Sequence, residues 1–249
     1  MIKVGKKTLA LCAGLCAAAG LMAGCEEELT QPGSVPNESQ GAADGYITTL
    51  PDQGTTSNGH YQIINLQNHR SFVVHVPFNA DKRHRLPVVV AMHGYEMDAG
   101  KMFKGTDLSQ GDAITVFVQG AGKAWAPAPY AVTSLEDDLK YVDDTIDFVR
   151  RHYPASDTTY GVGFSNGGGF ARAVTCKRPG LFDAVATVSA AKYDRVEEDC
   201  ASEPTDYLDI HGTEDVLMKY GGGHQHGAHY RSVKQSLRGI ARENGCNPF

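Results

Sequence analysis

The chain has 249 residues, enough for one domain with a substantial core after a short leader is set aside. Hydrophobic residues make up 41% and charged residues 21% of the chain, which are ordinary values for a globular protein. The first 25 residues hold three lysines and no acid, so the remainder carries a formal charge of −9 rather than −6, and binding to nucleic acid is not expected.

The N-terminus has the pattern of a secretory leader. A basic stretch that ends at Lys7 precedes a short apolar stretch and then Ala23-Gly24-Cys25. The small pair before Cys25 resembles the lipobox of bacterial lipoproteins, in which the cysteine is acylated. We therefore expect leader residues 1–25 and an exported cell-envelope lipoprotein whose only membrane contact is the lipid on Cys25. Ordinary secretion, with Cys25 incidental, is the alternative.

Residues 26–59 are rich in small, polar and acidic side chains, which predicts a flexible polar tether. The folded domain is expected over residues 60–249. Strands are predicted at 61–66, 71–77, 86–92, 114–118, 158–162, 184–189 and 207–210, and helices at 135–152, 166–176 and 230–244. This alternation predicts an α/β protein with a doubly wound, mostly parallel sheet, whose site lies beyond the carboxyl ends of the strands.

The run Gly163-Phe164-Ser165-Asn166-Gly167 lies where a predicted strand ends and a predicted helix begins. A nucleophilic serine on so sharp a turn needs small neighbours, and Gly163 and Gly167 supply that room. The pattern predicts that Ser165 is the nucleophile of an acyl-transfer reaction and that the Asn166 N–H is one donor to the oxyanion. An incidental serine in a glycine-rich turn is the alternative.

The loop after the strand at 86–92 reads His93-Gly94-Tyr95, and the Tyr95 N–H is expected to be the second oxyanion donor. His93 is assigned to the substrate-binding loop, with a side chain that is structural rather than the general base. Trp125 is expected to line the acyl pocket, or else to be part of a packed loop.

A triad also needs an acid on a loop after a later strand. The stretch from Tyr207 to Asp215 supplies three candidates. We favour Asp215 because it lies in the loop past the strand, whereas Asp209 falls within the strand and Glu214 is an adjacent competitor.

Taken in order, these motifs resemble a known group of enzymes. His93-Gly94, the Trp125 region, Asp137-Asp138, residues 163–168 and residues 211–215 are similar to the secreted polyhydroxybutyrate depolymerases and feruloyl esterases, a group that includes bacterial esterase lipoproteins. The resemblance covers residues 60–249 and implies the α/β-hydrolase fold and a serine esterase without cofactor or metal. Its substrates would be carboxylic esters, including hydroxyalkanoate polyesters or feruloyl and acetyl groups on polysaccharide. A peptidase on the same fold has less support.

Members of that group carry the catalytic histidine beyond a helix that ends in Asn-Gly-Cys. Here Asn244-Gly245-Cys246 is followed by three residues. The resemblance therefore implies a C-terminally incomplete domain that lacks the last strand and helix, the triad histidine and the partner of Cys246, and that has little esterase activity. A catalytically inactive, surface-tethered binding protein is the alternative function.

His224, His226 and His229 lie in a glycine-rich stretch soon after Asp215. We expect a solvated loop there, with a metal site and a substitute general base as the alternatives. Cys176 and Cys200 flank one predicted strand, so in an exported domain they are expected to form a disulfide.

Overall fold

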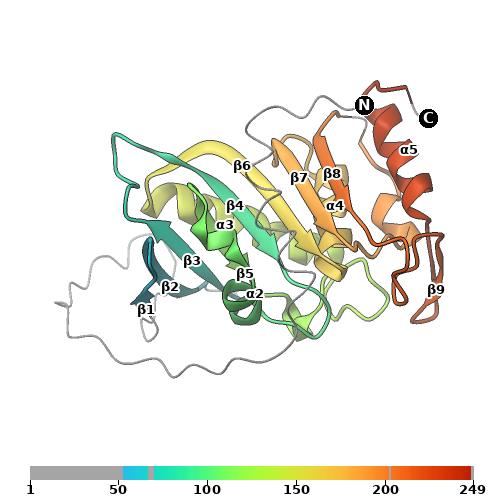
Figure 1. Cartoon of the computed structure of the whole chain (residues 1–249), viewed down its shortest axis with the longest axis horizontal. Coiled ribbons are helices and arrows are strands. Elements are labelled where there is room, and N and C mark those ends of the chain that lie inside the picture. The colour runs from blue at the N-terminus through green and yellow to red at the C-terminus, as the bar shows by residue number, and fades with distance from the viewer. Residues whose placement is uncertain (1–52, 67–69, 202, 248–249) are drawn as a thin grey trace.

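The computed structural model describes residues 53–66, 70–201 and 203–247. The expectations for the leader, for Cys25 and for most of the tether lie outside these residues. In the described part the chain forms an eight-stranded sheet with the strand order β1-β2-β3-β5-β4-β6-β7-β8, and a separate hairpin of β9 and β10 (Figure 1).

The sheet is antiparallel at one end and parallel through its centre. Its antiparallel strands are β1 (Gln53–Thr55), β2 (Gly59–Asn65) and β3 (Ser71–Pro77). Its parallel strands are β4 (Leu86–Met92), β5 (Ile114–Val118), β6 (Ala155–Phe164), β7 (Ala184–Val188) and β8 (Asp206–Ile210). Because β1 pairs with β2, the folded part begins within the segment expected to be tether.

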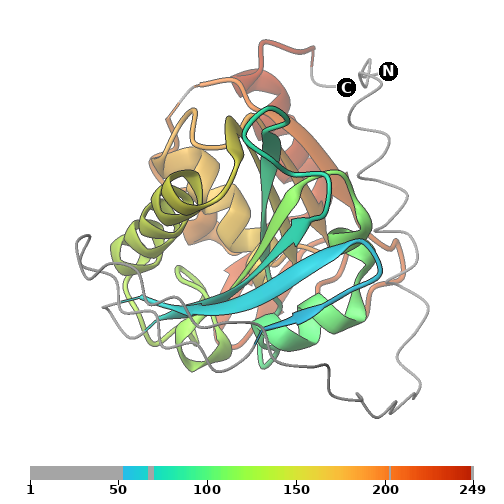
Figure 2. The same cartoon turned by 90° about the vertical axis from the view of Figure 1, so that its left-hand side faces the viewer.

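The helices are α2 (Ala99–Gly105), α3 (Leu135–His152), α4 (Asn166–Lys177) and α5 (Val233–Glu243), with short 3-10 helices η2 (Asp107–Gln110), η3 (Ala121–Lys123) and η4 (Asp194–Glu197). Viewed along the sheet, α3 and α4 lie on one face and α2 on the other (Figure 2). No described helix combines the length and the apolar character that a membrane span requires.

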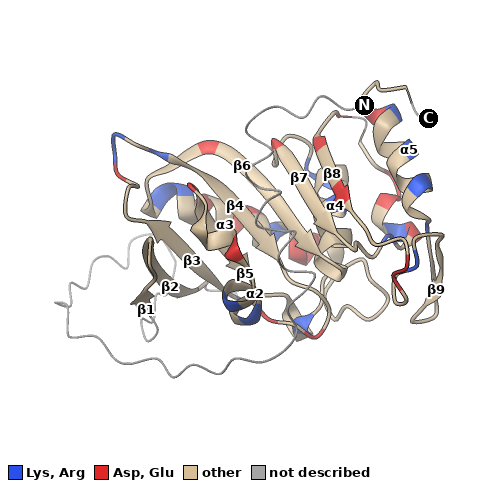
Figure 3. Ribbon diagram, viewed as in Figure 1, with Lys and Arg blue, Asp and Glu red and all other residues tan. Residues whose placement is uncertain are grey.

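Helix α3 shows how the sequence specifies these elements. Ser134 and Asp137 form a reciprocal capping box at its start, and acids in the first turn oppose basic residues in the last turn (Figure 3). The final helix begins at Val233 rather than at 230, because Tyr230 belongs to β10 and Ser232 caps the helix.

Alternate residues of the parallel strands fill two cores. Val88 and Val90 belong to the core beneath α3 and α4, while Val89 and Ala91 belong to the core on the α2 face. Strands covered on both faces need apolar residues at successive positions, which explains the continuous β-branched run of β4.

Two further links hold the end of the described chain to the body. A disulfide joins Cys176 of α4 to Cys200, which precedes β8, whereas Cys246 is free and exposed. Arg172 of α4 lies 2.7 Å from the Glu243 carboxylate of α5. Helix α5 is thus held against α4 by a partly buried ion pair.

Candidate active site

Ser165 occupies the sharp turn between β6 and α4. Its backbone has φ 52° and ψ −114°, a conformation that non-glycine residues seldom adopt. The Ser165 N–H donates to Val188 O at 2.8 Å, and Ser165 O accepts from the Ala191 N–H at 2.9 Å. The side chain is half-buried at the N-terminus of α4, and no side chain of the described residues hydrogen-bonds its Oγ.

The glycines around Ser165 are required by close backbone approach. A Cβ on Gly163 would lie 2.3 Å from Gly167 O, and one on Gly167 would lie 2.1 Å from Met92 O. A Cβ on Gly169 would lie 2.3 Å from Ala191 O. Any side chain at these positions would therefore displace α4 or the backbone against which it packs, in β6, in β4 or after β7.

The predicted oxyanion loop lies against this turn. A Cβ on Gly94 would meet the Phe164 ring at 2.9 Å, so the residue before Tyr95 packs on the residue before Ser165. Neither the Tyr95 N–H nor the Asn166 N–H donates to another described residue. Both N–H groups are thus free to donate to a substrate oxygen.

His93 and Trp125 lie beneath the loops, and both side chains are fully buried. His93 Nδ1 donates to Gly94 O at 2.8 Å, its Nε2 accepts from the Gly120 N–H at 2.9 Å, and Trp125 Nε1 donates to His93 O at 3.0 Å. Burial lowers the pKa of His93 below its ordinary value of 6.5, so the ring is neutral. Both ring nitrogens of His93 are hydrogen-bonded. The side chains of His93 and Trp125 therefore help to fix the conformation of the loops that carry them.

The Trp125 loop is clamped by two polar side chains, that of Asn166, of which the sequence analysis assigned only the backbone N–H to the site, and that of Asp138, which it did not assign to the site. Asn166 accepts from the Trp125 N–H at 2.8 Å and donates to Trp125 O at 3.0 Å. Asp138, fully buried, accepts from the Ala126 N–H at 2.8 Å and from Arg70 at 2.9 Å. The sequence feature that could have identified Asp138 is its position on the apolar face of the predicted helix, four residues before Val142.

Asp215 lies in the loop after β8, as predicted. Its Oδ1 accepts from the N–H groups of Leu217 and Met218, both at 2.9 Å, and its Oδ2 lies 3.5 Å from His211 Nε2. His211 Nε2 also donates to Met218 O at 2.6 Å. The Asp215 carboxylate is thus ordered, yet no described histidine bridges it to Ser165.

The competing acids are placed differently. Asp209 pairs with Lys192 at 2.9 Å, and both side chains are almost completely buried. Asp209 also accepts from Thr187 at 2.7 Å, and Glu214 is exposed. Asp209 therefore stabilises the β7–β8 region through a buried ion pair and a hydrogen bond.

The histidine-rich stretch forms a hairpin rather than the expected loop, and its three histidines are exposed to solvent. β9 (Gly223–Gln225) pairs with β10 (Ala228–Tyr230), and both turn residues, His226 and Gly227, have positive φ. His224 and His229 face each other across the hairpin with ring centroids 5.0 Å apart, and His229 contacts Asp194 at 2.8 Å. Among the described residues, no three histidine, cysteine or acidic side chains gather as metal ligands.

The chain matches no family model. It is 24% identical over 204 residues to a probable feruloyl esterase C of Aspergillus niger, covering 78% of this chain and 67% of that protein. It is 28% identical over 181 residues to feruloyl esterase C of Emericella nidulans, covering 69% of this chain and 63% of that protein. The chain thus spans about two thirds of the length of these relatives or slightly less.

Two solved structures share its architecture. A ferulic acid esterase from Anaeromyces mucronatus, solved with ferulic acid, superposes with a TM-score of 0.51 at 17% identity over 88% of each chain. A thermostable esterase gives a TM-score of 0.55 at 15% identity over 75% of this chain and 52% of its own. The chain has the α/β-hydrolase fold.

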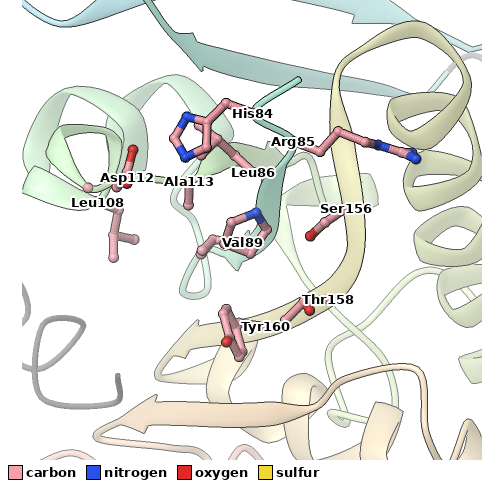
Figure 4. Close-up of a pocket in the computed structure, with 12 residues that line it drawn as sticks. His84, Arg85, Leu86, Val89, Leu108, Asp112, Ala113, Ser156, Thr158 and Tyr160 are labelled. Atoms are coloured by element: carbon pink, nitrogen blue, oxygen red, sulfur yellow. The ribbon is translucent and has the colours of Figure 1, made fainter. Parts of the chain in front are cut away.

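In the α/β-hydrolase fold the reactive serine stands at the carboxyl ends of the parallel strands. A hollow of about 530 Å³ lies at the opposite end of this sheet. Residues from the first part to the middle of β4 and β6 line it, including Leu86, Val89, Ser156 and Tyr160 (Figure 4). Because Ser165 follows the last residue of β6, this hollow is separate from the candidate site.

Proposed function

We propose that this protein is an exported serine esterase that hydrolyses carboxylic esters through an acyl-enzyme formed on Ser165. The observation that carries the proposal is the strained Ser165 turn, which places an unbonded Oγ at the N-terminus of α4. A nucleophile at such a turn can be reached by substrate, and the helix N-terminus favours developing negative charge. The similarity to feruloyl esterases supports an ester as the substrate.

In the proposed reaction Ser165 Oγ attacks the ester carbonyl, and its proton passes to a general base. The Tyr95 and Asn166 N–H groups donate to the tetrahedral oxyanion, which then collapses and expels the alcohol as the base returns its proton to the leaving oxygen. Water next attacks the acyl-enzyme, which releases the acid and restores the Ser165 hydroxyl. Asp215, whose carboxylate is ordered by two backbone N–H groups, would orient a histidine base.

The proposed substrates are feruloyl esters of polysaccharide, and hydroxybutyrate polyesters and acetyl esters are further classes to be tried. The lipobox-like Cys25 would attach the enzyme to a cell envelope, where polymeric esters are accessible. Because no described histidine bonds Ser165, an ester-binding protein without turnover is the second candidate.

Replacement of the nucleophile tests the proposal. Ser165→Ala should remove any ester turnover that the wild type shows, because the attacking oxygen is lost. A fluorophosphonate should label the wild type at Ser165, which peptide mapping would locate. Ser57→Ala, at an exposed serine in the β1–β2 turn, is the matched control and should keep full activity and labelling.

Persistent turnover or labelling in Ser165→Ala would contradict the proposal. Saturable binding of methyl ferulate by a wild type that turns over no ester in the panel would favour the second candidate instead.

A further inference from the structure

Three neighbouring strands of the sheet end in register, and a serine follows two of them. Phe164, Val188 and Ile210 are the last residues of β6, β7 and β8, and each pairs with the next across the strands. The three strands are parallel, so their carboxyl ends meet at one edge of the sheet (Figure 1). Ser165 therefore has Ser189, the residue after β7, as its neighbour at that edge.

Two backbone hydrogen bonds hold the segment that contains Ser189 against Ser165. The Ser165 N–H donates to Val188 O at 2.8 Å, and Val188 O belongs to the same peptide group as the Ser189 N–H. On the other side of Ser189, the Ala191 N–H donates to Ser165 O at 2.9 Å. The backbone of Ser189 is thus held next to that of Ser165 by a bond before it and a bond after it.

The Ser189 side chain has no hydrogen-bond partner within the described part of the chain, and the residue is half-buried. The next residue, Ala190, is buried against α4, because a Cβ on Gly168 would lie 2.9 Å from the Ala190 Cβ. The hydroxyls of Ser165 and Ser189 are thus two polar groups without a partner in the described fold, on neighbouring residues of one sheet edge.

Ser189 also shares with Ser165 a backbone conformation that is unfavourable for serine. Its φ is 48°, and that of Ser165 is 52°. Positive φ favours glycine, so a serine in this conformation lowers the stability of the fold relative to glycine. The Ser189 hydroxyl does not offset that loss, because it bonds to no described residue. A side chain that is strained, unbonded and next to a nucleophile indicates a role in the reaction.

The spacing of the strands brings the two hydroxyls within reach of each other. Neighbouring strands lie about 4.8 Å apart, and residues in register lie side by side across that distance. The two hydroxyls are not hydrogen-bonded to each other in this conformation, but a rotation about χ1 changes which neighbour a serine oxygen meets. Hydrogen bonds between catalytic groups often tighten only when substrate is bound.

We propose that Ser189 is a further catalytic residue of the esterase site, whose hydroxyl donates a hydrogen bond to Ser165 Oγ whenever that oxygen carries negative charge. Charge develops there as the base removes the Ser165 proton during attack, and again as Ser165 Oγ leaves the acyl carbon during hydrolysis of the acyl-enzyme. Ser189 keeps its own proton in both steps, and the base takes up and returns the proton that moves. The inference rests on the proposed function and adds a residue to that same site.

A cysteine at position 165 tests the hydrogen bond without any turnover. The thiolate of Ser165→Cys reacts with iodoacetamide, so the pH profile of alkylation, read by peptide mapping, reports how readily the group ionises. Adding Ser189→Ala should move the midpoint of that profile upward by about one pH unit, because a donor to the thiolate is lost. Ser57→Ala, which removes an exposed hydroxyl, is the control and should leave the midpoint unchanged.

Ester turnover tests the role in catalysis, and the strain at position 189 separates that role from a structural one. Ser189→Gly removes the hydroxyl and the strain together. It should lower kcat for p-nitrophenyl acetate by about ten- to a hundredfold without lowering the melting temperature. Asp199→Gly is the matched control, because Asp199 is exposed and has a φ of 50° in the segment before β8. It should keep full turnover.

An unchanged alkylation midpoint in Ser189→Ala, or an equal rise in the Ser57→Ala control, would overturn the role of Ser189. Full turnover by Ser189→Gly would overturn it as well. If the midpoint rises as expected but the wild type turns over no ester, the hydrogen bond stands and only the proposed function is wrong. If the wild type turns over ester and the midpoint does not move, the proposed function stands and only this inference is wrong.

Discussion

The backbone conformation of Ser165 lowers the stability of the fold by about 1–3 kcal/mol, which contacts of the neighbouring residues must offset. Its N–H and C=O are both bonded to the chain at and after the end of β7, so the turn is held from one side. The glycines at 163 and 167 let β6, α4 and β4 approach one another closely next to it, and Gly169 lets Ala191 approach α4. The Ser165 turn therefore depends both on the small residues around it and on hydrogen bonds to the neighbouring strand.

Gly167→Ala tests this account. A Cβ at Gly167 would lie 2.1 Å from Met92 O and 2.5 Å from His93 O, both backbone atoms, so β4 or α4 must move. We expect a loss of about 2–3 kcal/mol in the free energy of unfolding, measured by denaturant titration, together with a loss of ester turnover. Gly105→Ala is the control, because a Cβ there meets nothing within 4 Å. Equal stability of the two variants would show that the contact at Gly167 relaxes.

His93 should make stability depend on pH. Its folded-state pKa is depressed by burial, so between pH 6.5 and that pKa the unfolded chain binds more protons. The stabilisation is complete above pH 6.5 and is lost as pH falls, by at most about 2 kcal/mol between pH 6.5 and 5. His93→Gln, which can still accept from Gly120 and donate to Gly94, should flatten this part of the profile. Burial also lowers the pKa of His75, but His75 contributes equally in both proteins. An unchanged profile would therefore contradict the assignment of this pH dependence to His93.

At the scale of elements, helix α3 does more than cover the sheet. Asp138, in the first turn of α3, accepts a hydrogen bond from the loop that carries Trp125, and Asn166 of α4 accepts one from the same loop. One loop is thus clamped by the N-terminal turns of two helices. The loop conformation therefore depends on hydrogen bonds from both helices.

Asp138→Asn should therefore destabilise the protein strongly. The change removes the charge that pairs with Arg70 and turns one acceptor into a donor facing the Ala126 N–H or the Thr133 hydroxyl. We expect a loss of about 3 kcal/mol in the free energy of unfolding, as is usual when a buried ion pair is broken. Asp144→Asn, which breaks the exposed pair with Lys140 on the same helix, should cost less than about 0.5 kcal/mol. Similar losses in both variants would argue against a clamp.

For the whole molecule, the described C-terminal segment is held by contacts distant in sequence. Arg172 and Glu243 join α4 to α5, Arg231 and Glu197 join the chain after β10 to η4, and the disulfide joins α4 to the segment before β8. These links hold α5 and the segment after the β9–β10 hairpin against α4 and η4. The position of that hairpin is therefore a property of the assembled fold.

The disulfide should contribute mainly by restricting the unfolded chain. Cys176 and Cys200 are separated by 24 residues, for which the chain-entropy estimate is about 3 kcal/mol. Cys176→Ser combined with Cys200→Ser should lower the free energy of unfolding by about this amount under oxidising conditions. Cys246→Ser, at the exposed free cysteine, should leave stability unchanged. Recovery of Cys176 and Cys200 as free thiols from non-reduced protein would show that the bond does not form.

The amino-acid sequence by itself determined the class of fold and most of its elements, although helix α2 was not predicted. The β-branched run at 86–92, the capped and dipole-matched helix at 135–152 and the glycine-flanked serine all express local preferences, which act within a few residues. It did not disclose the β9–β10 hairpin, because glycine and histidine carry little apolar periodicity. Only the tertiary structure decided that Asp138 anchors a loop and that His226 meets Tyr95 and Tyr193. Those contacts join residues far apart in sequence, so they exist only once the sheet has brought its loops to one edge.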